Sequence, residues 1–229
     1  MRFWLDKGVD GFRVDAIPQL CEDVRFLDEP LTGNPNPEDY GYTHKIYTKS
    51  QPRTYEIVKK WREVIDEYSE RVMMMEANGN ITHTMKYYVY GAHFPFNFGF
   101  LDETNQDSKA TDFKRLIDRW MVNMPVLRGT ANWVLYESDI HIIIGLMFDK
   151  KSEIYFNYKI LGFSTNPKTW LSVNKNYVTL NLAAQKKQNN SYYALYKAVS
   201  ALRKWPAVKR PTTKLTTKLL GDDVLALTT

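Results

Sequence analysis

The stretch Gly11-Phe12-Arg13-Val14-Asp15-Ala16 decides the fold that the sequence predicts. Apolar residues on both sides of a charged pair indicate a buried strand of a parallel sheet, which we expect over residues 11–17. Because side chains alternate along a strand, Arg13 and Asp15 point to the same face. A neighbouring Arg⁺ favours the ionised carboxylate that a nucleophile needs. Spacing alone leaves two interpretations open, a nucleophile or an ion pair that merely fixes a strand end.

A second carboxylate follows a second apolar run. Residues 71–77 read Arg-Val-Met-Met-Met-Glu-Ala, so Glu76 ends another predicted strand. Partial desolvation at such a position favours the protonated form that a general acid needs. The alternative is an ordinary loop glutamate just beyond a core strand. The interval between Asp15 and Glu76 holds one loop and one helix, which places both carboxylates at the ends of neighbouring parallel strands.

The sequence around these carboxylates resembles a known family. Residues 3–10, Phe-Trp-Leu-Asp-Lys-Gly-Val-Asp, followed by Gly-Phe-Arg-Val-Asp-Ala-Ile, resemble the nucleophile strand of glycoside hydrolase family 13, the α-amylase and α-glucosidase family. The longer match, through Ile-Pro-Gln-Leu, is most similar to the maltases of insects. Met-Met-Met-Glu-Ala-Asn resembles the strand that carries the family's acid/base. The resemblance implies that Asp15 is the nucleophile, Glu76 the acid/base and Arg13 a substrate-binding residue.

The third acid of the family is matched only in part. The family strand reads roughly Asn-Trp-Val-Leu-Gly-Asn-His-Asp, in which the Asp stabilises the transition state and the His binds the sugar. This chain has Asn-Trp-Val-Leu-Tyr-Glu-Ser-Asp at 132–139. Asp139 falls at the family spacing, whereas Tyr136, Glu137 and Ser138 replace the Gly, Asn and His. Asp139 is therefore a candidate transition-state stabiliser, and the alternative is a chance match at the start of a foreign segment.

Alternating strand and helix patterns predict an α/β fold, and the resemblance implies a partial (β/α)₈ TIM barrel of roughly strands 4–7 and helix 8. The strands are expected at 11–17, 71–77, 92–98 and 131–135. Helices are expected at 54–68, around 113–121 and at 191–205. Four strands leave open edges and half of the apolar interior exposed, so we expect poor solubility of the chain alone.

The domain organisation follows from where the resemblance is lost and returns. We expect residues 1–135 to form the central part of the catalytic barrel and 136–161 a disrupted or foreign segment. Residues 162–210 are expected to form the end of the barrel with helix 8, and 211–229 the start of a C-terminal β-domain. Lost periodicity predicts that 136–161 is the least ordered part of the chain.

Composition excludes several function classes. The net charge is +5, but basic and acidic residues are interspersed and no nucleic-acid-binding module is recognisable, so nucleic acid is not expected as a partner. A single cysteine, Cys21, excludes an internal disulfide. No run approaches the ~18 apolar residues of a membrane span, and no signal peptide is expected before the first motif. Four histidines lack metal-ligand spacing, so no metal site is predicted: His44, His83, His93 and His141.

The resemblance implies a retaining α-glucosidase that hydrolyses maltose, sucrose or short oligosaccharides without an organic cofactor. Its full-length members are secreted or membrane-anchored. Because the chain is short for a barrel of about 250 residues, we expect it to be an inactive fragment, which is compatible with a chain that has no function in this form. An alternative is a non-catalytic binding module of the transporter heavy-chain ectodomain type. The presence of both Asp15 and Glu76 favours the enzyme.

Overall fold

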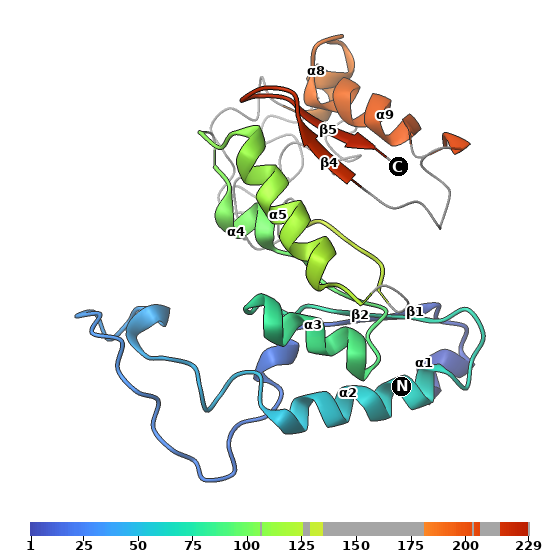
Figure 1. The fold of residues 1–229 in the computed structure, drawn as a ribbon. Coiled ribbons are helices and arrows are strands. Elements are labelled where there is room, and N and C mark those ends of the chain that lie inside the picture. The colour runs from blue at the N-terminus through green and yellow to red at the C-terminus, as the bar shows by residue number, and fades with distance from the viewer. Residues whose placement is uncertain (106, 126–128, 135–180, 203, 207–215, 229) are drawn as a thin grey trace, which may run out of the picture. The chain divides into compact units, whose positions relative to one another are not determined.

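In this computed structural model, a parallel sheet of three strands forms the centre of the first of two compact units (Figure 1). Its strands are β1 (Gly11–Val14), β2 (Val72–Met75) and β3 (Phe94–Pro95), in that order. Val14 pairs with Met75, and Met74 pairs with Phe94. The structure describes residues 1–105, 107–125, 129–134, 181–202, 204–206 and 216–228.

Helices precede or connect the strands and pack on the sheet. They are α1 (Arg2–Asp6), α2 (Pro52–Ile65) and α3 (Ile81–Tyr90). Helix α2 begins with Pro52, which suits the first helical turn because its missing N–H has no intrahelical partner there. Helix α3 is capped by the Asn80 side chain, which accepts a hydrogen bond from the His83 N–H, and ends at Gly91, whose φ is +117°.

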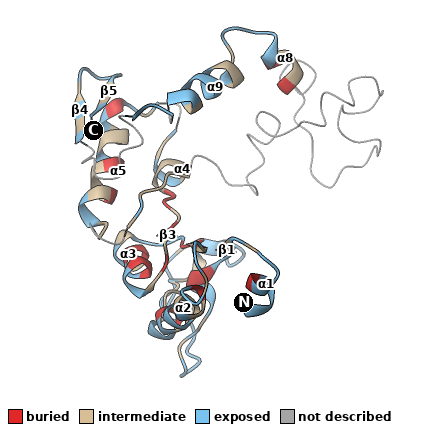
Figure 2. Cartoon of the chain, turned by 90° about the vertical axis from the view of Figure 1, so that its right-hand side faces the viewer, coloured by how far each residue is buried: buried red, intermediate tan, exposed pale blue. Residues whose placement is uncertain are grey.

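Alternation along the strands decides which side chains enter the core. Met73 and Met75 of β2 are fully buried against residues of α2 and α3, among them Val58 and Tyr87 (Figure 2). The odd and even positions of a strand face opposite sides, so Met74 and the residues in register with it lie on the other face of the sheet. Arg13 is in register with Met74 and therefore shares that face.

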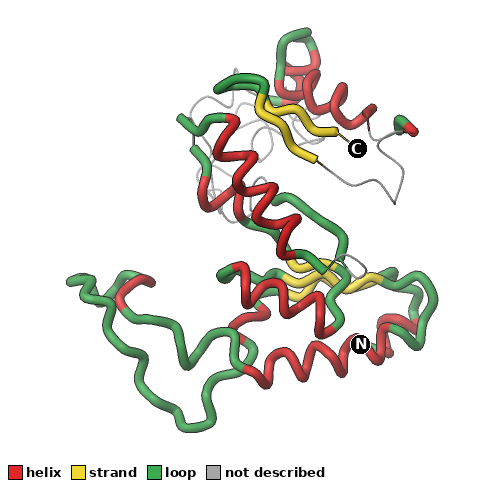
Figure 3. Tube along the Cα trace, in the orientation of Figure 1, coloured by secondary structure: helices red, strands yellow, loops and turns green. Residues whose placement is uncertain are grey.

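A long two-armed loop, residues 18–51, separates β1 from α2 (Figure 3). Its first arm (18–31) and second arm (40–51) run side by side through backbone hydrogen bonds. The Ser50 N–H donates to the Pro18 carbonyl at 2.7 Å, and the Asp23 N–H donates to the Tyr47 carbonyl at 2.8 Å. Clustered Pro, Gly and Asn residues predict a surface loop at 30–39, and this stretch is exposed at nearly every residue.

Two further helices complete the first unit, α4 (Gly99–Glu103) and α5 (Ala110–Asn123). Trp120 of α5 packs against Tyr88 of α3. Residues 217–225 belong to the same unit, because the Thr217 hydroxyl donates to the Asp118 carboxylate at 2.5 Å. They include most of β4 (Thr216–Leu219) and the first residue of β5 (Leu225–Thr228), which pair in a two-stranded sheet.

The second unit contains two described helices, α8 (Leu182–Lys186) and α9 (Tyr192–Leu202). Helix α9 confirms the helix predicted at 191–205, and none of its residues is buried. None of the helices in the described ranges is long and apolar enough to cross a membrane.

Three predicted strands need correction. The strand expected at 11–17 ends at Val14, because Ala16 adopts a left-handed conformation (φ 44°, ψ 36°) and turns the chain. The strand expected at 92–98 is only two residues long. No strand forms over 131–134 of the segment 131–135, since Asn132 holds the segment through its side-chain amide, which donates to the Pro95 carbonyl. The segment 136–161 lies outside the described residues.

Candidate active site

The two predicted carboxylates follow the paired ends of β1 and β2. Since Val14 pairs with Met75, Asp15 and Glu76 are the next residues on each strand. The Glu76 N–H donates to the Val14 carbonyl at 2.8 Å, and the Glu76 carbonyl accepts from the Ile17 N–H at 3.3 Å. The backbone of Glu76 is thus fixed on both sides by the chain around Asp15, which confirms the placement of both carboxylates at adjacent parallel strand ends.

One guanidinium joins these carboxylates. Nη2 of Arg13 lies 3.0 Å from Oδ1 of Asp15 and also forms an ion pair with Oε2 of Glu76. Two oxygens that contact one nitrogen lie no farther apart than two hydrogen-bond lengths, about 6 Å. This upper limit is close to the ~5–5.5 Å between the carboxyl groups of retaining glycosidases. The spacing is therefore compatible with a nucleophile and an acid/base on one glycosidic bond.

The two carboxylates differ in their exposure to solvent. The Asp15 side chain is 73% exposed and the Glu76 side chain 17%. Asp15 is accessible to a ligand, whereas Glu76 is largely desolvated. The Glu76 carboxylate is thus partly shielded from solvent beside the Arg13 guanidinium. The sequence indicated the desolvation but not the contact with Arg13.

A third strand end contributes an aromatic ring. The guanidinium carbon of Arg13 lies 5.7 Å from the centroid of the Phe96 ring, which follows β3. On the sequence alone, the aromatic set Phe94, Phe96 and Phe98 favours barrel core over a sugar platform. Phe98 is indeed buried, but Phe96 is only half-buried and lies against the site. Arg13 therefore contacts residues from three neighbouring strand ends.

Asp139, the third predicted acid, lies outside the described residues. The segment that leads toward it lies beside β3, because the Asn97 N–H donates to the Asn132 side chain at 2.9 Å and the Val134 N–H donates to the Asn97 carbonyl at 3.0 Å. Trp133 stacks on Phe100 with 5.1 Å between ring centroids.

Two histidines of this unit serve the fold. Nδ1 of His93 accepts a hydrogen bond from the Met73 N–H at 3.0 Å, and desolvation together with nearby Arg62 lowers the pKa of His93. Nδ1 of His83 lies 3.1 Å from the Tyr55 hydroxyl. Over the described ranges, no three His, Cys, Asp or Glu side chains are grouped so as to hold a metal ion.

Comparison with known proteins identifies the family. Residues 1–161 and 154–210 match the model of the alpha-amylase catalytic domain. The chain belongs to this family. It is 38% identical to an alpha-glucosidase of Apis mellifera over 99% of this chain and 50% of that protein. It is 43% identical to Maltase A1 of Drosophila melanogaster over 61% of this chain and 27% of that protein.

Two solved structures illustrate the shared fold. The alpha-glucosyl transfer enzyme XgtA matches 99% of this chain and 54% of its own chain, with a TM-score of 0.73 at 18% identity. An inactive MutB variant in complex with isomaltulose matches 94% of this chain and 53% of its own, with a TM-score of 0.64 at 17% identity. The chain spans about half the length of the proteins that it matches over nearly all of its residues. The three described parallel strands do not close a barrel, which takes eight.

Proposed function

We propose that the chain carries the nucleophile and the acid/base of a retaining α-glucosidase that acts on maltose, sucrose or short α-linked oligosaccharides. The observation that supports this most is the pair of carboxylates, Asp15 and Glu76, at adjacent parallel strand ends on one nitrogen of Arg13. The high identity to an alpha-glucosidase of Apis mellifera supports the same activity.

Each carboxylate has one role in a two-step reaction. Asp15 attacks the anomeric carbon while Glu76 gives its proton to the leaving glycosidic oxygen, so the C–O bond breaks and a glycosyl ester forms on Asp15. Glu76, now a carboxylate, then takes a proton from water, which attacks the anomeric carbon and releases Asp15. Arg13 binds substrate and holds both carboxylates at the strand ends, and Asp139 is the proposed transition-state stabiliser.

Because the chain spans about half of its relatives, the test uses a graft. Residues 1–134 replace the matching segment of the Apis mellifera α-glucosidase, and hydrolysis of maltose and of a chromogenic α-glucoside is measured. We expect Asp15→Asn to lower kcat by about 10³-fold or more, since it removes the nucleophile. Glu76→Gln should slow the hydrolysis of maltose, whose leaving group is a sugar hydroxyl that needs a proton, more than that of the chromogenic substrate. Added azide should restore release of the sugar.

Matched controls come from the opposite ends of the same strands. Asp10 precedes β1 and Glu70 precedes β2, so Asp10→Asn and Glu70→Gln should leave the kcat of the graft within a few-fold of its parent. Equal losses in controls and site variants would refute the assigned roles. A folded graft that binds maltose without turnover would instead support the non-catalytic binding module.

A further inference from the structure

A pocket of ≈430 Å³ lies between the two arms of the loop that follows β1. Both arms supply its lining, which consists of Gln19, Leu20, Glu22, Tyr40, Lys45, Thr48 and Lys49. Its volume falls in the range of small-molecule sites, ~300–1,000 Å³. The first arm starts three residues after Asp15, so the loop leaves the sheet at the strand end that carries the proposed nucleophile. In barrels and open α/β sheets ligands bind at this end of the strands.

The lining combines one exposed aromatic ring with side chains that donate and accept hydrogen bonds. The Tyr40 side chain belongs to a residue that is 68% exposed, so much of its ring remains accessible although Lys45 lies 5.2 Å from its centroid. The Gln19 amide offers donors and an acceptor, and the Thr48 hydroxyl, whose hydrogen goes to Glu29, offers an acceptor. A pyranose presents a C–H face and a rim of hydroxyl groups. An aromatic ring matches the C–H face, and amide and hydroxyl groups match the rim.

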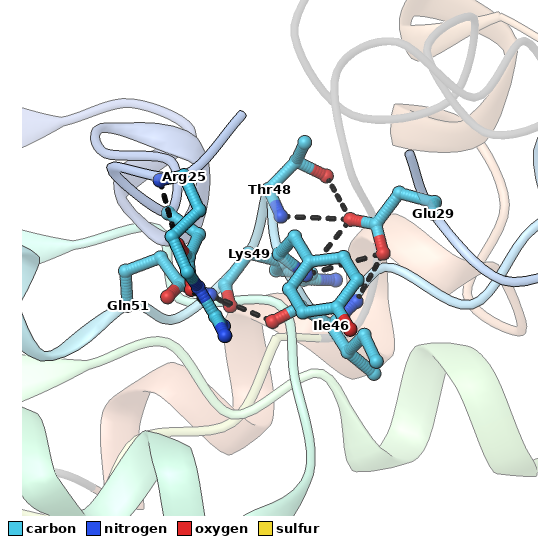
Figure 4. A network of polar contacts seen from close by, with 8 residues as sticks. Arg25, Glu29, Ile46, Thr48, Lys49 and Gln51 are labelled. Atoms are coloured by element: carbon cyan, nitrogen blue, oxygen red, sulfur yellow. Dashed lines mark hydrogen bonds and ion pairs between the residues drawn. The ribbon is translucent and has the colours of Figure 1, made fainter. Parts of the chain in front are cut away.

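Glu29 fixes one wall of this pocket. Its carboxylate accepts hydrogen bonds from the backbone N–H groups of Ile46 at 2.8 Å, Tyr47 at 3.0 Å and Thr48 at 2.7 Å (Figure 4). The Thr48 hydroxyl also donates to Glu29 at 2.7 Å. Glu29 belongs to the first arm, whereas its donors belong to the second, and Thr48 is itself a lining residue. The carboxylate thus sets the spacing of the arms before a ligand binds, which reduces the ordering cost of binding.

We propose that the pocket between the two arms binds a neutral pyranose unit of the oligosaccharide, with its C–H face on Tyr40, and that Glu29 is a positioning residue that holds the arms at the spacing this requires. The inference rests on the proposed function, because the substrate class is the one assigned to Asp15 and Glu76. It adds a binding site formed by the two-armed loop itself.

The single cysteine of the chain provides the test. Cys21 is partly exposed and lies between the lining residues Leu20 and Glu22. Its reaction with a thiol reagent is timed in the purified 229-residue chain with increasing maltotriose. A sugar that occupies the pocket slows labelling in proportion to the unoccupied fraction, about tenfold at ten times Kd. Tyr40→Leu should abolish this protection, and Glu29→Gln should both speed labelling without sugar and raise the sugar concentration needed.

Two control variants change the same residue types at positions that do not line the pocket. Glu38 is exposed between the arms of the loop, and Tyr192 is exposed on α9. Glu38→Gln and Tyr192→Leu should keep full protection. Protection that persists in Tyr40→Leu, or labelling that maltotriose does not slow, would overturn the proposal. Equal protection by inorganic phosphate alone would also overturn it, because the two lysines would then bind an anion.

Variants of Asp15 and Tyr40 distinguish sugar binding in the pocket from sugar binding at the strand ends. Asp15→Asn should keep protection, because Asp15 does not line the pocket. If Asp15→Asn loses protection while Tyr40→Leu keeps it, sugar binds only at the strand ends and the pocket assignment is wrong. In the graft described above, Tyr40→Leu should raise KM for maltotriose several-fold, whereas Glu38→Gln should not, and equal KM values would contradict the proposal even if the chain alone does not fold.

Discussion

The strand ends and the two-armed loop each surround a carboxylate with close hydrogen-bond donors, but the donors differ in kind. At the strand ends, the side chain of Arg13 forms ion pairs with both Asp15 and Glu76. In the loop, the donors to Glu29 are three consecutive backbone N–H groups and the Thr48 hydroxyl. A guanidinium can turn toward a ligand, whereas backbone donors move only if the loop moves.

We expect this difference to separate a carboxylate that meets a ligand from one that holds the chain. Asp15 remains 73% exposed beside its ion pair and is available to a substrate. At Glu29, burial alone raises the pKa, but hydrogen bonds from Thr48 and the backbone outweigh it, so the pKa of Glu29 is lowered. Donors that favour the ionised form stabilise the loop only while Glu29 is charged.

The largest expected effect is the loss of hydrolytic activity when the strand ends stand without the rest of a barrel. We expect the 229-residue chain alone to hydrolyse no chromogenic α-glucoside above an Asp15→Asn blank. The chain spans about half the length of its relatives, and without the remaining walls the sugar is neither positioned nor shielded from water. Positioning contributes roughly 7–11 kcal/mol to catalysis. Turnover above the blank would show that these strand ends suffice for a working site.

The next largest effect is on stability, and it compares a glycine of the sheet with a glycine of the loop. A Cβ on Gly11 would lie 2.1 Å from the Val72 carbonyl oxygen, so Gly11→Ala forces β1 and β2 apart. We expect a loss of about 3 kcal/mol in the free energy of unfolding. Gly33, in the loop, has φ +91° but open space around it, so Gly33→Ala should cost only about 1 kcal/mol of backbone strain.

Urea titrations followed by tryptophan fluorescence measure both variants, since Trp61, one of the six tryptophans, packs against the core of the first unit. Equal losses of unfolding free energy in Gly11→Ala and Gly33→Ala would mean that the close approach of β1 and β2 does not require glycine at position 11.

The sequence predicted the elements that have a clear apolar period. Helices α2, α5 and α9 and strand β2 lie within a few residues of their predicted positions. Helix α3 was missed, because its sequence is rich in Tyr and Thr and shows no narrow apolar stripe. The signals that could have found it are Asn80 before it and Gly91 after it, which cap its two ends.

The candidate site was also predicted only in part. The family resemblance indicated Asp15, Glu76 and Arg13, and the strand pattern put the carboxylates at neighbouring ends. The ion pair between Arg13 and Glu76 joins residues far apart in sequence, so it depends on the register of β1 with β2. No local pattern fixes that register. Asp139 stays a prediction, because it lies outside the described residues.

A smaller effect is expected at Glu29, and it depends on pH. Glu29→Gln removes the charge and one acceptor oxygen, so we expect the loop to lose about 1–2 kcal/mol at neutral pH, allowing for solvent screening. Because the folded-state pKa of Glu29 is lowered, the unfolded chain binds more protons than the folded chain between that pKa and the ordinary value of 4.5. Its stabilisation is complete above the ordinary value of 4.5 and is lost as the pH falls below it through the folded pKa.

Hydrogen exchange of the Ile46, Tyr47 and Thr48 amides reports this stabilisation directly. The parent should exchange more slowly than Glu29→Gln at neutral pH, and the two should converge in acid. Glu38→Gln should match the parent throughout. A pH-independent difference between the parent and Glu29→Gln would show that the Glu29 charge is not what holds the arms together.

The smallest expected effect is at Ala16, where the chain turns directly after Asp15. A left-handed conformation costs a residue with a Cβ about 1–2 kcal/mol, and Ala16 adopts it at φ 44°. Glycine removes this cost but adds roughly 0.5–1 kcal/mol of unfolded-chain entropy, so Ala16→Gly should stabilise the unit by less than about 1 kcal/mol. Ala16 is exposed, so no cavity forms. Ser50, at the base of the loop, is also left-handed (φ 56°), but its side chain is partly buried. Ser50→Gly also removes the contacts of that side chain and should therefore stabilise less than Ala16→Gly or destabilise, and the reverse order in urea midpoints would contradict the turn after Asp15.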